Sequence, residues 1–377
     1  MKSVVLYAYP PEPDGLSIQG DLLYKGLVEA GYESLPCNPE AGLQKEFYFK
    51  NFKPHVAFGV GYWANVPRLV REPLKFGVTP VPWFNADGWV ANYHKDLSDL
   101  KLMFTTSEWV KQTYKRDGVN VERMVVLPIG IETDLFKPMQ DASILKIREM
   151  LGVADDEKII LTAGGDVTSK GAQEMFMALA KVNEKFKKWK YVCKSWPSDV
   201  AHDWHAEESQ IVKELGIQDK VIFLEGSFSK EFMPYLLNAC DIYAAPSRLE
   251  GFGMIQVEAM SCGRPVISIN AMGPSETIVH GKTGFLAKVA SKIMLTQEWV
   301  YPWMGFDEEK IIEFDEPKMF ALRADVDELA NYTYELLADD SLRARIGAQA
   351  REHAVANFDY KDISKKAAEI TKKALGL

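Results

Sequence analysis

Short apolar segments alternate with stretches of helical spacing along the first half of the chain. A helix is expected over Leu16–Ala30, between the first two strands. This alternation is typical of βα units, which form a parallel sheet with helices on its faces. The strands predicted in this half are Val4–Tyr9, Val56–Val60, Pro80–Phe84, Leu102–Thr105 and Val125–Leu127.

The same alternation restarts after a segment rich in proline and glycine, Leu127–Pro138, which is typical of a linker. A chain of 377 residues exceeds the usual size of a single core, so two doubly wound domains in tandem are predicted. The strands expected in the second half are Lys158–Ala163, Lys190–Cys193, Val221–Leu224, Ile242–Ala245 and Pro265–Ile269.

Residues 290–320 interrupt this rhythm with an aromatic stretch centred on Trp299–Phe306. An exposed run of this kind would be an interaction patch, and a loop packed on its own domain is the alternative. Helices are then expected over Val326–Ala338, Leu342–Asn357 and Tyr360–Leu375. Aromatic residues gather near the ends of early strands, and core packing explains at least half of them. Trp63 and Trp89 are the better candidates for an acceptor site, because flat aromatic faces suit sugar rings or other apolar surfaces.

Composition and charge narrow the function classes. The hydrophobic fraction of 47% and the charged fraction of 26% are ordinary for a globular enzyme, and there is no apolar run of membrane-spanning length. A net charge of −9 disfavours nonspecific binding to nucleic acid, so no nucleic-acid partner is expected. The four cysteines lack metal-binding spacing and are interpreted as buried free thiols, which with the N-terminal strand indicates a cytoplasmic protein.

The most informative stretch is Pro246–Val266, which contains Glu250 and Glu258 on either side of a Gly-Phe-Gly turn. Eight positions are a little over two helical turns, so both carboxylates are expected on one side with the turn's amides between them. Free amides at the start of a helix attract phosphate, and carboxylates accept hydrogen bonds from hydroxyls. A ligand with both groups is a nucleotide sugar.

This stretch, followed by Gly273–Glu276 and Gly281–Leu286, resembles the C-terminal signature of the family-4 retaining glycosyltransferases (glycosyl transferase group 1). The resemblance extends to Val221–Gly226 and Lys170–Gly171. It implies a GT-B fold, in which two Rossmann-like doubly wound α/β domains face each other across a cleft and the last helix crosses back to the first domain. The predicted domains are 1–136 plus 360–377, for the acceptor, and 137–359, for the nucleotide sugar.

The resemblance also assigns roles to residues of this chain. Glu250 would lie against the donor sugar, Glu258 would accept from the ribose hydroxyls, and Lys170 would neutralise the diphosphate leaving group. The amides of Gly251, Phe252 and Gly253 would contact sugar and phosphate, while Gly226 and Phe228 would border the base. The implied reaction is transfer of a hexose from a UDP- or GDP-sugar with retention, without a metal or a separate cofactor.

Two departures from the family pattern concern charged groups. The arginine that usually precedes the lysine is absent from Gly164–Gly171, so Arg248 or Lys194 is expected to supply the second phosphate cation. The histidine usual in the first domain is also absent, and Asn85 or Asp87 is the candidate for its role at the donor sugar or acceptor hydroxyl. Gly15, at the entry to the first helix, is a further candidate for phosphate or sugar contact.

Other functions remain open at this point. The missing arginine would also suit a catalytically weak nucleotide-sugar-binding partner subunit, and a GT-B sugar phosphorylase or epimerase is a further alternative. The acceptor is expected to be a carbohydrate, lipid or protein. The lysines of Lys361–Lys373 would allow peripheral membrane contact, and a homo-oligomer is compatible with the sequence.

Overall fold

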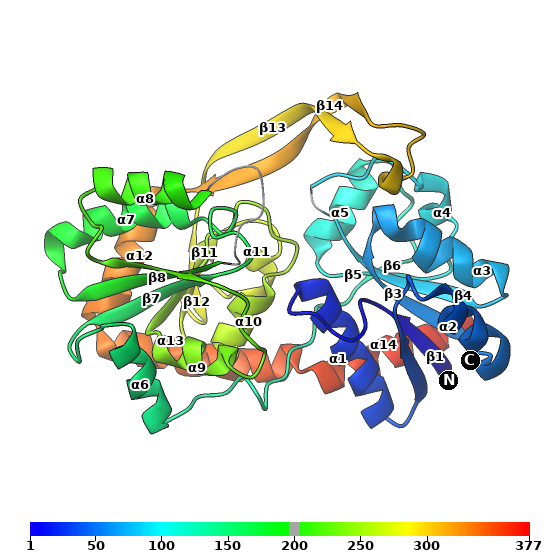
Figure 1. Ribbon diagram of the computed structural model, residues 1–377, viewed down its shortest axis with the longest axis horizontal. Coiled ribbons are helices and arrows are strands. Elements are labelled where there is room, and N and C mark those ends of the chain that lie inside the picture. Colours follow the sequence, from blue (N-terminus) through cyan, green and yellow to red (C-terminus); the bar gives the residue numbers. More distant parts are fainter. Residues whose placement is uncertain (87, 196–203) are drawn as a thin grey trace. The chain divides into compact units, whose positions relative to one another are not determined.

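The computed structural model describes residues 1–86, 88–195 and 204–377. The chain divides into two compact units, both built from separate stretches of sequence (Figure 1). Unit 1 comprises Met1–Glu132, Met294–Met319 and Phe358–Leu377, and unit 2 comprises Thr133–Ile293 and Phe320–Asn357. These units differ from the predicted domains mainly in the segment Met294–Met319. The sequence predicts this segment in the C-terminal domain, 137–359, whereas in the structure it belongs to unit 1 because its side chains pack there.

Unit 1 contains a six-stranded parallel sheet in the order β2-β1-β3-β4-β5-β6. Its strands are β1 (Lys2–Leu6), β2 (Glu33–Cys37), β3 (Val56–Tyr62), β4 (Thr79–Asn85), β5 (Met103–Thr105) and β6 (Met124–Val126). Its helices are α1 (Gly15–Glu29), α2 (Gly42–Phe47), α3 (Glu72–Lys75), α4 (His94–Ser98), α5 (Glu108–Arg116) and α14 (Tyr360–Leu375). The five predicted strands are present, and β2 was missed because Pro36 and Ser34 hide its apolar pattern.

Unit 2 repeats this architecture with the strand order β12-β11-β10-β7-β8-β9. Its strands are β7 (Lys158–Ala163), β8 (Trp189–Ser195), β9 (Val221–Glu225), β10 (Ile242–Ala244), β11 (Val266–Ile269) and β12 (Gly284–Ala287). Its helices are α6 (Ala142–Met150), α7 (Ala172–Lys185), α8 (Trp204–Glu214), α9 (Met233–Ala239), α10 (Met254–Ser261), α11 (Pro274–Thr277), α12 (Val326–Ala338) and α13 (Asp340–Phe358). Two doubly wound sheets are therefore confirmed, and all four cysteines are buried and free.

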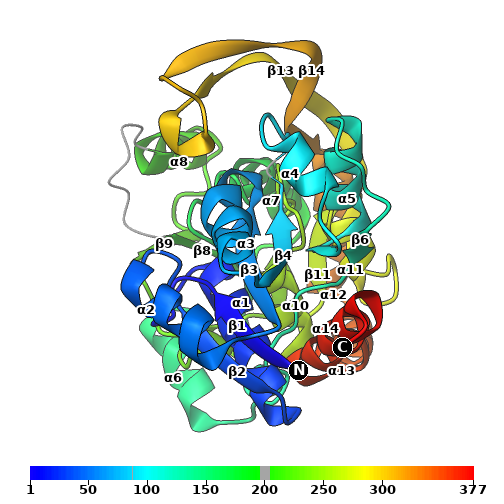
Figure 2. The ribbon, with the colours of Figure 1, turned by 90° about the vertical axis from the view of Figure 1, so that its right-hand side faces the viewer.

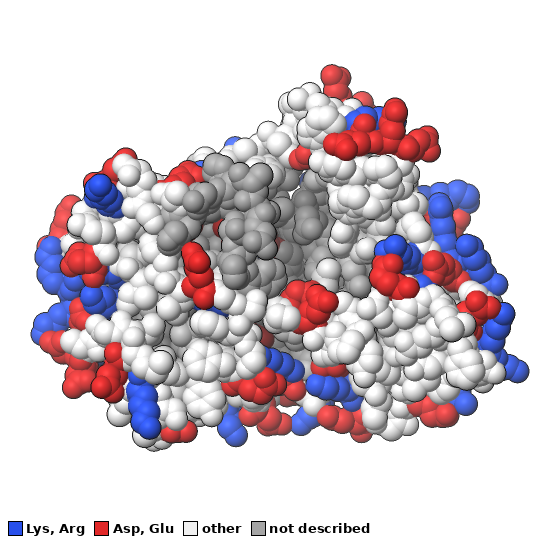
Figure 3. Space-filling model, in the orientation of Figure 1, with Lys and Arg blue, Asp and Glu red and all other residues white. Residues whose placement is uncertain are grey.

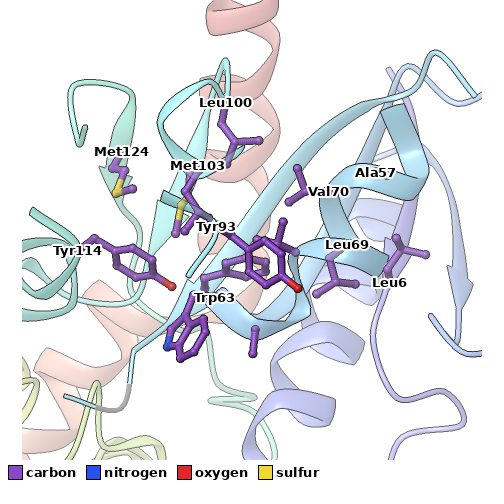
Figure 4. Packing of buried hydrophobic residues seen from close by; sticks show 14 of the residues in the cluster. Leu6, Ala57, Trp63, Leu69, Val70, Tyr93, Leu100, Met103, Tyr114 and Met124 are labelled. Carbon is purple, nitrogen blue, oxygen red and sulfur yellow. The ribbon is translucent and has the colours of Figure 1, made fainter. Parts of the chain in front are cut away.

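Buried side chains on one face of the sheet, together with the helices and loops that cover this face, form a core cluster of unit 1 (Figure 4). The central strand β3 is buried from Val56 to Val60, which explains its continuous apolar run. Around it lie the residues labelled in the figure, Leu6, Ala57, Trp63, Leu69, Val70, Tyr93, Leu100, Met103, Tyr114 and Met124. Trp63 is only 4% exposed, so this ring is a core residue and the expectation that it forms an open acceptor surface is wrong.

The last helix, α14, packs against α1 within unit 1, as the GT-B resemblance implied (Figure 2). Tyr360 donates from its hydroxyl to Glu29 at 2.8 Å, and its backbone amide donates to Ile131 O at 3.0 Å. Buried small side chains, Ser364, Ala367 and Ala368, line the inner face of α14, and Lys365 and Lys366 lie on the exposed face. Small residues therefore set the close approach of the two helices.

Gly26 of α1 provides the tightest point of this contact. A Cβ at position 26 would lie 2.5 Å from Ser364 Cβ, so a Gly26→Ala variant must push α14 away from α1. We expect the loss of packing to destabilise unit 1 by about 1–3 kcal/mol despite the better helix propensity of alanine. Thermal unfolding measures the change, and Gly42→Ala is the matched control because nothing lies within 4 Å of a Cβ there. Equal melting temperatures for the two variants would contradict the prediction.

The aromatic insertion forms a hairpin of β13 (Val289–Val300) and β14 (Lys310–Ala324). Its tip belongs to unit 1, where Met304 and Phe306 pack against the core cluster and Asn92 Nδ2 donates to Gly305 O at 2.9 Å. Its last residues belong to unit 2, where Leu322 N donates to Arg248 O at 2.7 Å. The expected loop on the C-terminal domain is thus corrected to a hairpin whose tip packs on unit 1.

Charged side chains are spread over the visible face of the protein, and acidic ones gather at the tip of the β13–β14 hairpin (Figure 3). Asp307, Glu308 and Glu309 are exposed in this region of the sequence. In the described part of the chain, no helix is both long and apolar enough to cross a membrane.

Candidate functional site

The loop after β10 carries Glu250 and leads into α10 through Gly253. Gly253 has a φ of +93°, a conformation that favours glycine, and it ends the turn at the first residue before the helix. Gly273 supports the turn from behind, since its amide donates to Glu250 O at 3.0 Å and a Cβ there would lie 2.5 Å from Phe252 N. The Gly251-Phe252-Gly253 turn is therefore fixed by close backbone packing.

The loops after β7 and β10 are joined at Lys170–Gly171. Arg248 N donates to Ser169 O at 2.8 Å, and a Cβ on Gly171 would lie 2.4 Å from Pro246 O. Gly164 leaves room for the lysine stem, because a Cβ at Gly164 would lie 2.8 Å from Lys170 Cγ. These contacts bring the ammonium group of Lys170 to the Gly-Phe-Gly turn.

Lys170 and Glu250 form the centre of the site. Lys170 Nζ lies 2.6 Å from Glu250 Oε2, and the other oxygen, Oε1, accepts from Gly253 N at 3.0 Å. Phe252 N lies within 3.5 Å of the same oxygen. The carboxylate thus occupies an anion site that a lysine and two amides at a helix start provide, the arrangement that binds phosphate in other proteins.

Glu258 lies inside α10 and is 6% exposed, and its side chain has no hydrogen bond or ion pair with any residue that the structure describes. Burial raises its pKa to about 8, although the charge of Lys230 opposes the shift. Glu250 precedes α10, so the expectation that two helical turns align the carboxylates is wrong, and the glycine turn positions Glu250 instead. A buried carboxyl group without a partner is suited to accept hydroxyls from a ligand.

The two candidate phosphate cations differ in their surroundings. Arg248 donates to Glu174 Oε1 at 3.1 Å and to Gln173 Oε1 at 2.8 Å, and Arg323 lies 3.3 Å from the same Glu174 carboxylate. Glu174 is 1% exposed, so Arg248 is held by a buried ion-pair cluster. Its role in the structure is to neutralise Glu174, which sequence reasoning missed because no motif marks the contact.

Lys194, by contrast, is 5% exposed at the carboxyl end of β8 and has no carboxylate partner among the described residues. Its Nζ lies 5.3 Å from the centre of the Phe228 ring, and burial lowers its pKa. Its backbone carbonyl accepts from Gly164 N at 3.1 Å, which places Lys194 beside the loop that leads to Lys170. Lys194 is therefore the better placed of the two cations for a ligand.

Gly226 and Phe228 follow β9, next to Lys194. Gly226 has a φ of +129° and its amide donates to Ser195 O at 3.1 Å, so it turns the chain at the end of the strand. Phe228 packs edge-on against Phe232 at 5.3 Å. The structure thus brings Gly226, Phe228 and Lys194 together, and it separately joins Lys170, Glu250 and the Gly251–Gly253 turn.

The remaining two predicted residues belong to unit 1. Asp87 lies outside the described residues. Gly15 begins α1, but Asp14 Oδ1 accepts from Leu16 N and Ser17 N at 3.0 Å each, so a carboxylate already caps the helix amides. A Cβ at Gly15 would meet nothing within 4 Å, so no close approach of backbone requires glycine there. These contacts do not favour Gly15 as a phosphate contact.

A second feature that sequence reasoning missed is a buried carboxyl group that contacts Thr168, a residue of the loop that leads to Lys170. Glu208 of α8 is 3% exposed and accepts a hydrogen bond from the Thr168 hydroxyl. Burial raises its pKa to about 7, against the lowering effect of the Thr168 hydrogen bond. Asp166 shapes the same loop by accepting from Thr168 N at 2.8 Å.

Unit 1 has a pocket of about 190 Å³ at the carboxyl edge of β1 and β3. Tyr7, Val60 and Leu69 line its interior, and polar groups at its wall include Asp14, Asn65 and Arg68. The Arg68 guanidinium pairs with Glu40, another residue of the wall. The sequence did not single out this pocket because its residues come from separate segments between Tyr7 and Leu69.

The chain is similar in sequence to known glycosyltransferases. Residues 143–298 match the family model described as glycosyl transferases group 1. A D-inositol 3-phosphate glycosyltransferase from Stackebrandtia nassauensis is 27% identical over 66% of this chain and 54% of its own length. An MMP alpha-(1->4)-mannosyltransferase from Mycolicibacterium hassiacum is 25% identical over 68% of this chain and 50% of its own length. The chain spans about half the length of these curated relatives.

Solved structures share the fold over the whole chain. Sucrose-phosphate synthase from Thermosynechococcus elongatus covers 100% of both chains with a TM-score of 0.75 and 18% identity. HepE from Anabaena, solved with UDP and glucose, covers 99% of this chain and 100% of its own, with a TM-score of 0.74 and 18% identity. The predicted GT-B fold and the resemblance to group 1 glycosyl transferases are confirmed.

Proposed function

We propose that this protein is a retaining glycosyltransferase that moves a hexose from a UDP- or GDP-sugar to a hydroxyl group of an acceptor, without a metal ion. The observation that carries the proposal is the Lys170–Glu250 pair at the start of α10, with Glu258 inside α10, buried and without a hydrogen-bond partner for its side chain among the described residues. This arrangement offers a cation and backbone amides for a diphosphate, and a carboxyl group that can accept hydrogen bonds from sugar hydroxyls. A nucleoside diphosphate linked to a sugar needs all three.

Each group has a separate task in the proposed reaction. The bond between the anomeric carbon and the phosphate oxygen breaks, and its electron pair passes to the leaving diphosphate, which Lys170 and the turn amides stabilise. The acceptor oxygen bonds to the anomeric carbon on the same face, and its proton passes to the departing phosphate oxygen. Glu250 holds the donor sugar and Glu258 the ribose.

Retention predicts that proton NMR of the initial product shows the same anomeric configuration as the donor. A product with the opposite configuration would contradict the retaining mechanism.

The proposal also assigns the acceptor, a carbohydrate, lipid or protein, to the unit 1 pocket. A screen of nucleotide sugars by thermal shift, followed by nucleotide release without acceptor, tests the donor half of the proposal. An enzyme releases nucleotide slowly and loses this activity when Glu250 is replaced by alanine. A binding subunit would be stabilised by the ligand and would release nothing.

Lys194 is proposed as the second donor cation in place of the missing arginine. Lys194 is buried and has no acid partner in the part of the chain that the structure describes, so its ammonium group would gain a charged hydrogen bond on binding. Lys194→Ala is therefore expected to weaken UDP or GDP binding about tenfold or more. Arg248→Ala is expected to act mainly on stability, because it removes a partner from the buried Glu174. Isothermal titration and thermal unfolding separate the two effects, with Lys187→Ala as an exposed control. Unchanged nucleotide affinity in Lys194→Ala would exclude this role.

A further inference from the structure

The tip of the β13–β14 hairpin holds an exposed tryptophan in a fixed position on unit 1. Trp303 is 56% exposed, although the residues that follow it are docked on the unit 1 core. Asn92 Nδ2 donates to Met304 O at 3.2 Å and to Gly305 O at 2.9 Å. Gly305 has a φ of +86°, and a Cβ there would lie 1.9 Å from the Tyr93 hydroxyl, so the turn lies flat on Tyr93.

The strand that leaves the tip is anchored as firmly. Phe314 packs against Trp89 at 5.4 Å between ring centres, and Trp89 packs against the buried Trp63 at 5.5 Å. Lys318 Nζ lies 2.8 Å from Oδ1 of Asp117, a carboxylate that is 1% exposed. Although burial opposes it, hydrogen bonds from Arg116 and Lys318 lower the pKa of Asp117. Met304, Phe306, Phe314 and Lys318 therefore hold the hairpin on unit 1, while the Trp303 side chain stays largely exposed.

Trp303 adjoins the unit 1 pocket through Tyr62. The two rings meet edge to face, with centres 6.5 Å apart and planes at 87°, and Tyr62 is part of the pocket wall. On its other side Trp303 stacks on Tyr301, with centres 6.2 Å apart and planes at 10°. An aromatic surface formed by Tyr62, Tyr301 and Trp303 thus continues the wall of a pocket that both apolar and polar side chains line.

The pocket has the size of a small ligand site. Its volume of about 190 Å³ is below the roughly 300 Å³ at which sites for drug-sized ligands begin, so it suits a group of about one sugar ring. A longer ligand held there must continue outside the pocket. The aromatic surface at Trp303 offers a place for that continuation.

The charges around the hairpin tip favour a neutral ligand on this surface. Asp307, Glu308 and Glu309 follow the aromatic residues and are exposed, so they repel phosphate and the headgroups of anionic lipids. The face of an exposed indole has a negative potential, which attracts the weakly positive C–H groups of a sugar ring. The hydroxyl groups of the same ring then lie near the edges of the indole, where water can still hydrate them. Because the tip is fixed before binding, little entropy is lost when a ring stacks on it.

We propose that Trp303, with Tyr301 and Tyr62, forms a saccharide subsite next to the acceptor pocket, and that the acceptor is a glycan or glycoside of at least two sugar rings. One ring lies in the pocket and a neighbouring ring stacks on Trp303. This inference rests on the proposed function, because it takes the unit 1 pocket as the acceptor site. It names the class of acceptor, which the donor site does not reveal.

The test uses the full-length protein and neutral α-linked gluco- and manno-saccharides of one, two and three rings. Binding is measured by titration and by saturation-transfer NMR in the presence of UDP. We expect at least one disaccharide to bind the wild type about tenfold more tightly than its monosaccharide, and Trp303→Ala to remove this gain without changing monosaccharide binding. Trp303→Phe should keep part of it. Trp299→Ala is the matched control, since Trp299 is 46% exposed on the same hairpin and is not one of the three residues of the aromatic surface.

Two results would overturn the subsite. One is that no second ring improves binding to the wild type, and the other is that Trp303→Ala binds disaccharides as well as Trp299→Ala does. If Trp303→Ala fails to fold, the wild type is labelled with 6-fluorotryptophan and studied by fluorine NMR instead. Comparison with Trp303→Phe assigns the Trp303 signal. This signal must shift when the disaccharide is added and must not shift with the monosaccharide. UDP binding and donor hydrolysis are measured on the same proteins. Their absence in the wild type would refute the proposed function, whereas their presence without a Trp303 effect would refute only the subsite.

Discussion

Replacing Glu250 by glutamine is expected to lower sugar transfer by about a hundredfold to a thousandfold, while UDP or GDP binds as tightly as before or more tightly. The carboxylate now occupies the Lys170 ammonium group and the Gly253 amide, both of which the diphosphate needs. Removing the negative charge frees these groups for the ligand but leaves the reacting sugar without its carboxylate. The size of the loss is that of one well-placed group in a transition state.

Transfer rates and nucleotide titrations on the same variant provide the measurement. Glu149→Gln, an exposed glutamate of α6 in unit 2, is the control and should change neither quantity. Lys170→Ala should show the opposite pattern in binding, with weaker nucleotide affinity. A Glu250→Gln variant that loses nucleotide affinity as Lys170→Ala does would contradict the view that Glu250 competes with the diphosphate for this site.

Nucleotide binding at pH 7 is expected to release close to one proton from Glu258. The pKa of this buried carboxyl is about 8, so the group is mostly protonated at pH 7 when the site is empty. A carboxylate that accepts two ribose hydroxyls is stabilised in its charged form, so its pKa falls on binding and the proton leaves. Titrations in buffers of different ionisation enthalpy count this proton. Glu258→Gln should abolish the release, and a wild type that binds UDP without proton exchange would exclude the ribose contact.

The same carboxyl group makes stability depend on pH. In the unfolded chain Glu258 ionises near 4.5, and in the folded protein near 8, so between these values unfolding releases a proton. Stability attributable to this group is therefore present in full below about pH 4.5 and is lost as the pH rises towards 8. Relative to wild type, Glu258→Gln should gain several degrees in melting temperature between pH 5 and pH 8. Glu149→Gln should show no such trend.

The sequence was sufficient for the parts of the fold that depend on local pattern. The strands of both sheets were predicted within a few residues where their apolar runs were continuous, as in Lys158–Ala163, and the terminal helix was predicted from its amphipathic spacing. The hairpin was not predicted. Its strands carry apolar and charged residues without regular alternation, because only parts of it are covered by unit 1.

In the candidate site, residue types were predictable and pairings were not. The motif identified Lys170 and Glu250 as neighbours of a donor, but their direct ion pair depends on how two loops far apart in sequence meet. Arg248 and Lys194 were equivalent in the sequence, since each follows a strand. The buried Glu174, 74 residues away from Arg248, separates them, and no local signal reveals that contact.

The division of unit 1 into three stretches of sequence has a consequence for how the protein is made. On the ribosome, α1 emerges well before its partner helix α14, which is translated only after everything between Glu132 and Phe358. At about 5–20 residues per second, this interval lasts roughly 10 to 45 s. Unit 1 therefore cannot complete its fold before all of unit 2 has been translated. Until α14 has been translated, the face of α1 that packs against it stays exposed. This face is therefore accessible to chaperones that bind emerging chains.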